Sequence, residues 1–386
     1  MQPFVTPFRV PASVSVTDAA VENVIRRAEG VQFGAGCELL AGLSLVVADD
    51  GDVSAALASG SITRGSYNRL HATASLVFDQ PLPWASAIVR PFITMSDGTT
   101  TFRFNLGAYY TSSPQENLDE QPTKYAVTCY DILSVLDDPV GDAYSVAEGT
   151  PYLEAIESIL MSRGIVRYMI DQSAAGLTLT SDKAWEPSDQ LTWLTIVNDL
   201  LAAIGYAGIW SDWDGVLRCH SYQSPRERAP EWTYDVEPGT SMLGTRTKLR
   251  DFYKVPNVWI FTKRNDTDGP QPVEGDGRYT YINQSDGDTS IDGRGRTITR
   301  PVQVDAADQA SLVAAATRII DADLSIPSKV DLTTFPNPLH WHFDVVQLID
   351  PAVGPPTPVL VTAWTLPLNG DDMRHEWTLL DRLGAD

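Results

Sequence analysis

His340 and His342 form the one close pair of histidines in the sequence and are the first candidates for metal chemistry. On a β-strand, residues i and i+2 share a face, so both imidazoles would reach the same metal ion. His375 and Asp371 lie across a predicted turn and would complete such a site. The pair has no acidic or cysteine ligand between its members, and its neighbours are aromatic: Phe335, Trp341 and Phe343. We therefore predict that the two histidines pack in an aromatic cluster and hold no metal.

Motifs for nucleotide, serine-hydrolase and zinc-peptidase chemistry are absent from the sequence. It has no GxxxxGK[S/T], no GxGxxG after a strand, no GxSxG and no HExxH. Two acidic, glycine-containing stretches, residues 266–269 and 286–293, are similar to calcium loops. Both lack the glycine at loop position 6 and the glutamate at position 12 of an EF-hand, so we predict solvated turns. We predict no catalytic residue, no cofactor and no metal site.

Ten tryptophans and 50 acidic residues leave two further chemistries open. Exposed indoles stack on sugars, and a suitable pair of carboxylates hydrolyses a glycosidic bond. No pair of acids stands out from the rest. Six tryptophans lie within or beside apolar patterns, which favours core packing: Trp185, Trp193, Trp210, Trp213, Trp259 and Trp364. Carbohydrate binding and cell-wall hydrolysis therefore remain alternatives to a purely structural role.

The composition is that of a folded, acidic protein with several domains. The chain has 386 residues, which predicts roughly two to four domains. Its net charge of −22 argues against a protein that grips nucleic acid, because phosphate neutralisation needs clustered Lys and Arg. No long apolar run and no signal-like start occur, so we expect neither a transmembrane helix nor a secretory signal. Three widely spaced cysteines predict reduced core thiols: Cys37, Cys129 and Cys219.

The first 130 residues have the alternation of apolar and polar residues that is typical of β-strands. Ser96-Asp-Gly98 separates two alternating runs and predicts a hairpin, and residues 49–52 predict an acidic turn. The short strands suggest a barrel or a sandwich. Before them, residues 16–28 have the apolar spacing of a helix, with an extended arm as the alternative. The predicted strands are residues 43–47, 60–63, 72–78, 90–95, 99–104, 104–111 and 124–130.

The following hundred residues mix helices with short strands. One helix is predicted to begin after Thr150, as N-cap, and to end at Gly164. A second helix is predicted from about residue 190 to 204, with Ser188 as a cap candidate. Asp214-Gly215 predicts a hairpin between two short strands. Together these elements predict a small α+β module.

Residues 236–300 are rich in loops. Their glycine- and aspartate-rich part, 264–296, is predicted to be a contact arm or a mobile surface element and not part of a core. The last segment is predicted to open with a helix that Asp305 or Asp308 caps. The predicted strands in this half of the chain are residues 258–262, 279–282, 329–334, 345–349, 358–364 and 373–380.

Eight segments, taken in chain order, carry a resemblance to a known family: Ser59–Arg64, Leu82–Trp84, Val89–Phe92, Leu106–Pro114, Tyr130–Leu136, Trp193–Tyr206, Trp213–Leu217 and Gly370–Leu379. The chain resembles the tail-hub, or minor tail protein, family of long-tailed phages that infect actinobacteria. It is similar, more distantly, to the baseplate hub of contractile tails. The resemblance covers nearly the whole chain and depends on segment order more than on one motif.

The resemblance implies a mixed, mainly β fold in which two tube-like β-barrel domains bracket a smaller α+β middle. Strand-rich ends around a mixed middle agree with it. The predicted domains are an N-terminal β-barrel hub domain at 1–135, an α+β insert at 136–235, a loop-rich β segment at 236–300, and a C-terminal β-barrel domain with one helix at 301–386.

The resemblance also implies a structural, non-enzymatic role in the virion. Three copies would form a homotrimeric ring at the tail tip, which adapts the sixfold tail tube to threefold tip proteins and lines the DNA exit channel. Further implied partners are the distal tail protein, the tape-measure protein and other tip or fibre proteins. Phage DNA would pass during ejection without specific binding, which an acidic wall favours. The chain would be made in the host cytoplasm and would not insert into a membrane.

Overall fold

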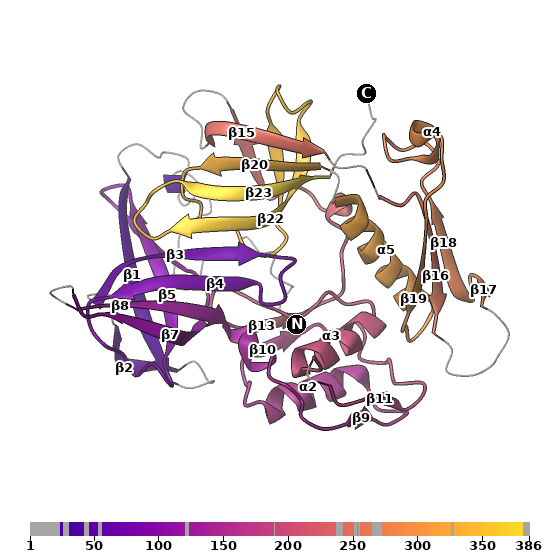
Figure 1. The fold of residues 1–386 in the computed structure, drawn as a ribbon, viewed down its shortest axis with the longest axis horizontal. Helices are drawn as coiled ribbons and strands as arrows, with labels where there is room; N and C mark the ends of the chain where they lie inside the picture. Colours follow the sequence, from indigo (N-terminus) through magenta and orange to yellow (C-terminus); the bar gives the residue numbers. More distant parts are fainter. Residues whose placement is uncertain are drawn as a thin grey trace.

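The computed structural model describes residues 24–25, 31–41, 46–52, 56–119, 123–188, 190–236, 242–250, 253, 255–264, 272–325 and 328–380. Strands make up 44% of it and helices 17%, so the predicted mixed, mainly β class is confirmed. Figure 1 shows two regions of long strands side by side, a helical module below them and a small helix-and-sheet unit at the right. The predicted helix at 16–28 lies outside the described residues, except for Val24 and Ile25, which are helical and buried.

A single sheet of 14 strands joins the early and late parts of the chain, in the main order β15-β20-β23-β22-β3-β4-β8-β7-β5-β1-β2. β6 pairs with β5, β21 with β22 and β14 with β21. Because β22 pairs antiparallel with β3, the first and last strand-rich segments are continuous (Figure 1). The early strands are β1 (Gln32–Ala41), β2 (Val46–Asp52), β3 (Leu57–Gly65), β4 (Ala72–Phe78), β5 (Ile88–Ser96), β6 (Thr101–Asn105), β7 (Tyr109–Asn117) and β8 (Lys124–Asp131). The late strands are β14 (Trp232–Asp235), β15 (Met242–Arg250), β20 (Ser328–Thr334), β21 (Val345–Ile349), β22 (Thr357–Pro367) and β23 (Met373–Leu379).

Most of the early strands follow the predicted pattern. β1 was not predicted, and the predicted strand at 43–47 lies outside the described residues except for its last two, which belong to β2. β5 and β6 form the predicted hairpin around Ser96-Asp-Gly98. The predicted strand at 104–111 is interrupted, because Gly107 has a φ of +96° that an extended strand does not allow, and β7 starts only at Tyr109. The predicted acidic turn at 49–52 is wrong, since these residues belong to β2. Among the described residues, β2 is the last strand at this end of the sheet.

The largest core lies against one face of the long sheet. Along β4, the residues Ala72, Ala74 and Leu76 are buried, and the residues between them face the other way. This period of two is the one that a strand with one buried face needs. Late strands contribute to the same core, with Val361 and Trp377 among its members. The three cysteines are buried thiols that form no disulfide, as predicted, Cys37 and Cys129 in this core and Cys219 in the next one.

An α+β module with its own core lies between β8 and β14. Its helices α2 (Tyr152–Ser162) and α3 (Trp193–Ala203) pack against each other. None of the helices in the described part of the chain is long and apolar enough to cross a membrane. The shorter elements of the module are β9 (Tyr144–Val146), β10 (Tyr168–Ile170), β11 (Lys183–Trp185), β12 (Trp210–Ser211), β13 (Leu217–Cys219) and the 3-10 helices η2 (Ile132–Val135) and η3 (Pro225–Glu227).

The predicted helices and hairpin of this module are confirmed, but the helix caps differ from the predicted ones. Pro151 occupies the cap position of α2 in place of Thr150. The Thr192 side chain accepts a hydrogen bond from the Thr195 amide and caps α3, so Ser188 is not its cap. β12 and β13 form the hairpin around Asp214-Gly215.

A small α/β unit forms the third core and corrects the prediction for residues 264–296. Residues 265–271 lie outside the described part, but β18 of this stretch is an inner strand of a four-stranded sheet. Tyr279 and Tyr281 of β18 pack on a core that includes Trp259 and Phe261. The stretch therefore does contribute to a core, because two aromatic side chains compensate for its glycines. The elements are β16 (Val258–Lys263), β17 (Val273–Glu274), β18 (Gly277–Ile282), α4 (Ile291–Arg294), β19 (Thr299–Val304) and α5 (Gln309–Ser325).

Of the two predicted caps for α5, the structure selects Asp308. Its side chain accepts a hydrogen bond from the Ser311 amide at 2.7 Å, and its carbonyl accepts one from Leu312. This is the geometry by which an N-cap satisfies the first amides of a helix. The division of the chain at residues 135, 235 and 300 remains a prediction.

Candidate functional site

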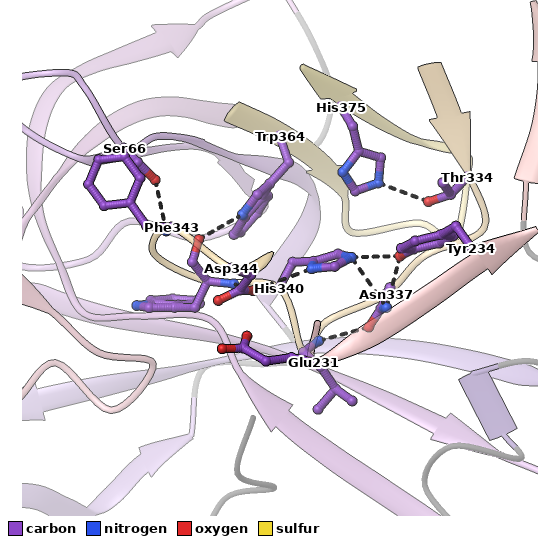
Figure 2. A network of polar contacts seen from close by, with 12 residues as sticks. Ser66, Glu231, Tyr234, Thr334, Asn337, His340, Phe343, Asp344, Trp364 and His375 are labelled. Atoms are coloured by element: carbon purple, nitrogen blue, oxygen red, sulfur yellow. Dashed lines mark hydrogen bonds and ion pairs between the residues drawn. The ribbon is translucent and has the colours of Figure 1, made fainter. Parts of the chain in front are cut away.

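A buried polar network ties the late strands together where they meet the turn between β20 and β21 (Figure 2). The Tyr234 hydroxyl lies 2.6 Å from Nε2 of His340 and accepts a hydrogen bond from the Asn337 amide at 2.9 Å. Nδ1 of His340 lies 3.3 Å from Oδ2 of Asp344. The same carboxylate oxygen accepts a hydrogen bond from the Trp341 amide at 2.6 Å. The network thus holds the turn against β14.

These contacts assign the proton of His340 to Nδ1. Tyr234 accepts from Asn337 and donates to Nε2 of the histidine, which leaves Nδ1 to donate to Asp344. A histidine and an aspartate in this arrangement are suited to general-base chemistry when a substrate can reach the ring. Here both side chains have 0% exposure, and the second ring nitrogen is taken by Tyr234. The pair therefore acts as a clamp within the fold.

Of the four residues considered as metal ligands, the structure brings only His340 and His375 together. His340 and His342 lie in a turn and not on a strand, so they do not share a face. His340 meets His375 with ring centroids 5.4 Å apart, whereas His342 stacks on Trp210 at 5.2 Å. Asp371 is exposed at the turn before β23. Among the described residues, no group of three or more His, Cys, Asp or Glu side chains is placed to hold a metal ion.

All five histidines of the chain lie in or beside this junction. His71 and His342 are in ring contact at 4.5 Å, and His220 approaches the same Trp210 from its edge. Burial lowers the pKa of His71 to about 3 and the pKa of His342 and His375 well below the usual value. Burial also lowers the pKa of His220. These four rings are therefore neutral in the folded protein at neutral pH.

A buried ion pair joins two of the early strands, and Ser211 of the α+β module bonds to both of its members. Arg64 of β3 is 1% exposed, and its Nη1 lies 4.0 Å from Oδ2 of Asp131 on β8. Its Nη2 donates to the Ser211 carbonyl at 3.3 Å, and its guanidinium lies 4.5 Å from the ring centroid of Trp341. Ser211 in turn donates from its hydroxyl to Asp131 at 2.8 Å. One cation thus links four separate segments.

Burial shifts the pKa of both members of this ion pair. Burial lowers the pKa of Arg64, and the Asp131 carboxylate opposes that effect. Burial raises the pKa of Asp131, while Arg64 and the Leu133 amide oppose it. Sequence reasoning missed the pair. The available signal was Arg64 itself, a charged residue on the inward side of β3, two residues after buried Ile62.

Seven of the ten tryptophans are buried, and Trp84, Trp193 and Trp213 are half-buried against a core, so the predicted core packing is confirmed for four of the six considered above and is partial for Trp193 and Trp213. All ten lie within the described residues, and none of them is exposed. Several indole N–H groups are taken by internal acceptors, such as Asp199 for Trp185 and Asp323 for Trp259. The described part of the chain therefore offers no exposed indole on which a sugar would stack.

The face of the long sheet that turns away from the core has an unusual composition at its centre. Cross-strand pairing aligns Thr365, Thr63 and Thr73 in one row and Ser61, Ser75 and Thr128 in the next. The hydroxyls of Thr63 and Thr365 lie 3.1 Å apart. We call these six positions on β22, β3, β4 and β8 the hydroxyl face. They carry no charge, although one residue in five of the chain is charged.

Comparison with known proteins gives a fold and no close relative. No protein-family model and no curated protein matches the sequence. The structure is similar to the tail protein from Neisseria meningitidis MC58, with a TM-score of 0.63 and 11% identity over 90% of this chain and 96% of that one. It is similar to the 43 kDa tail protein of prophage MuSo2 from Shewanella oneidensis, with a TM-score of 0.59 and 11% identity over 90% and 98%. The chain has the fold of these tail proteins.

A similar fold is found in a longer chain of a multi-protein complex. A chain of the Francisella PdpA-VgrG complex matches with a TM-score of 0.52 and 10% identity, over 92% of this chain and 53% of that one. In each comparison the match spans nine-tenths or more of this chain, so it includes parts of both the early and the late strands. At about one identical residue in ten, the likeness concerns the fold, and individual residues of those proteins are not carried over.

Proposed function

We propose that the chain is a structural, non-enzymatic hub protein of a phage tail tip that works as a homotrimer. The observation that carries this proposal is the tail-protein fold, which matches over 90% of the chain at TM-scores of 0.63 and 0.59. The acid–base groups agree with a structural role, because His340 and Asp344 are fully buried and serve as a clamp. The phages in question are long-tailed phages of actinobacteria.

The arrangement of the sheet supports a role as symmetry adaptor. Each chain contributes an early and a late group of strands, which lie side by side in one sheet through the β3–β22 pair. We propose that these groups form the two tube-like domains, the first at 1–135 and the second at 301–386 with β14 and β15 added from the middle segments 136–235 and 236–300. Three chains would then present six similar units to a sixfold tail tube and three equal outer surfaces to tip proteins.

We propose that the hydroxyl face lines the DNA exit channel. Its six serine and threonine side chains offer no cation to a phosphate, and the cation nearest to them in register is Arg374 of β23, which is paired with Thr365 at the edge of the face. A neutral wall of this kind lets the duplex slide, and the chain's net charge of −22 adds repulsion around it. The partners in the virion would be further copies of the chain, the distal tail protein, the tape-measure protein and tip or fibre proteins.

The oligomeric state is the first test of the hub proposal. We expect the purified full chain to have three times the mass of 42.2 kDa in mass photometry at micromolar concentration. Negative-stain images should show a threefold ring with a central hole, because a DNA conduit must be open along its axis. A stable monomer, or a particle without a hole, would contradict the proposed function.

The channel lining has a separate test. We replace Thr63, Ser75 and Thr128 by Lys in one variant, which places three cations per chain on the hydroxyl face. If this face lines the channel, the trimer stays intact and binds short duplex DNA about tenfold more tightly at low salt, with an affinity that falls as salt rises. A control variant carries the same three charges at exposed turn positions, Gln80, Ala85 and Ser285. Loss of the trimer would instead place the face at a contact between subunits.

A further inference from the structure

The turn between β20 and β21 meets two other parts of the fold through one imidazole ring. We call this turn, residues 335–344, the histidine turn. The ring centroid of His342 lies 4.5 Å from that of His71, which belongs to the loop between β3 and β4. The same ring stacks on Trp210 of β12, with centroids 5.2 Å apart and an angle of 17° between the planes. His342 therefore joins the late strands to an early loop and to the α+β module.

Three ring nitrogens at this contact have no hydrogen-bond partner among the described residues. They are Nδ1 of His71, Nδ1 of His342 and the indole N–H of Trp210, and all three atoms are buried. A neutral imidazole can leave Nδ1 as a bare acceptor, whereas a protonated ring carries a hydrogen on both nitrogens. A proton taken up here would therefore place an N–H where the described residues offer it no acceptor, which costs free energy.

The strongest charged influences on the two rings come from cations. Arg64 of β3 acts on both rings, and Arg228 acts on His342 together with the third nearby histidine, His220. Burial and these groups lower the pKa of His71 to about 3 and the pKa of His342 well below its usual value. The two rings thus meet at a place where a positive charge is disfavoured. The acids of this junction act on Arg64: Asp131, Asp212 and Asp344.

The backbone of the histidine turn is strained at Phe343, whose φ of +54° lies in the left-handed region that bulky side chains rarely adopt. Such a conformation persists only where surrounding contacts hold it. The Phe343 amide donates to the Ser66 hydroxyl at 3.4 Å, and the Phe343 carbonyl accepts from Arg228 at 2.7 Å. The Trp341 indole donates to the Ser211 carbonyl at 2.7 Å. These contacts belong to the same junction, so losing the junction lets the turn relax.

The strands on either side of the histidine turn stay paired without it. β20 pairs with both β15 and β23, and β21 pairs with both β14 and β22. Each of the two strands is therefore held on both of its edges by a ladder of backbone hydrogen bonds. The turn can leave the junction while the sheet remains intact.

We propose that the histidine turn is an acid-sensitive latch, which protonation of His71 and His342 releases from Trp210 while the sheet remains folded. In the released state, both rings reach water and take up protons at their ordinary pKa of about 6.5. Each ring then shifts the equilibrium towards release by about tenfold per pH unit below that value. Release loosens the late strands from the α+β module within one subunit, so the latch does not depend on the trimer proposed above.

Hydrogen exchange of the full chain, followed by mass spectrometry, tests the latch. Between pH 7 and pH 5.5, the protection of peptides from the histidine turn should fall about 70-fold, after correction for the intrinsic exchange rate at each pH. At pH 5.5 the turn should be less protected than β22 and β23, because its amides exchange through release and those of the sheet through global unfolding. A turn that is as well protected as the sheet at both pH values would overturn the latch.

Substitutions separate release of the turn from global unfolding. His71→Gln leaves one titrating ring in the latch, so the fall in protection should shrink to about eightfold, and adding His342→Gln should reduce it to about twofold or less. His375→Gln is the matched control, since that buried ring contacts His340 and lies outside the latch, and the turn should still lose about 70-fold. Equal effects of His375→Gln and His71→Gln on the turn would show that it opens only by global unfolding. Should the double variant fail to fold, His71→Gln alone decides between the two outcomes.

Discussion

Replacing Arg64 by Met should lower the free energy of unfolding by about 3–5 kcal/mol, because it leaves the Asp131 carboxylate buried without its cation. Arg64 and Asp131 are each 1% exposed, so water does not compensate for the loss. The change also removes the cation from the face of Trp341. Urea unfolding at neutral pH, followed by tryptophan fluorescence, measures the difference between the variant and the wild type.

Arg69→Met is the matched control. Arg69 lies five residues away and pairs with Asp137, but its side chain is 50% exposed, so we expect a loss of at most about 1 kcal/mol. Adding Asp131→Asn to Arg64→Met should recover part of the loss, because it removes the uncompensated charge. Equal effects of the Arg64 and Arg69 changes would show that the buried pair is not a main support of the fold.

The stability of the protein should fall as the pH is lowered from 7 to 5.5. His71, His342 and His375 have folded-state pKa values well below their unfolded value, so only the unfolded chain takes up their protons in this range, and the pKa of His220 is lowered in the same direction. Each histidine then removes about 1.4 kcal/mol per pH unit below about pH 6.5. Their contribution is complete above the unfolded pKa and is lost progressively below it.

One acid opposes this trend. Burial raises the pKa of Glu231 to about 8, so between its unfolded value and pH 8 the folded state holds the extra proton and gains stability on acidification. From pH 7 to pH 5.5 this gain is about 2 kcal/mol against about 4 kcal/mol lost through His71, His342 and His375, so the net loss is about 2 kcal/mol at pH 5.5. Burial also raises the pKa of Asp131 and Asp212, which work in the same direction as Glu231 as the pH falls further.

His71→Gln provides the control for this prediction. It removes one group with a lowered pKa, so its stability should depend less on pH than that of the wild type, by about 1.4 kcal/mol per pH unit. Urea midpoints at pH 7.5 and pH 5.5 measure both slopes. Identical midpoints for the wild type at the two pH values would contradict the assignment of neutral, buried histidines.

Features that depend on neighbours in the sequence were predictable. The hairpins at Ser96-Asp-Gly98 and Asp214-Gly215 follow from local turn chemistry, and α2 and α3 follow from their apolar spacing. Core packing of the tryptophans followed for the same reason, since each considered indole stood within or beside an apolar pattern. The mainly β class could be predicted from the number of segments in which apolar and polar residues alternate.

Features that depend on distant contacts were not predictable. The pairing of β3 with β22 joins the early and late strands into one sheet. No local sequence pattern indicates this pairing, because the register between remote strands is decided by packing. The histidine turn was mistaken for a strand, since the side-chain bonds of Asn337 and Asp344 that bend it are visible only in three dimensions. The part played by Tyr279 in a core was hidden by the glycines and aspartates around it.

The pairing of β3 with β22 also determines when the sheet can be completed during synthesis of the chain. Thr63 and Thr365 are 302 positions apart, and at about 5–20 residues per second a ribosome needs roughly 15–60 s to travel from one to the other. During that interval, the edge of β3 that later pairs with β22 has no partner strand. Because the late strands complete the sheet, the fold is complete only once nearly all of the chain has been synthesised. A chain that stops short keeps a bare strand edge, which chaperones and proteases recognise.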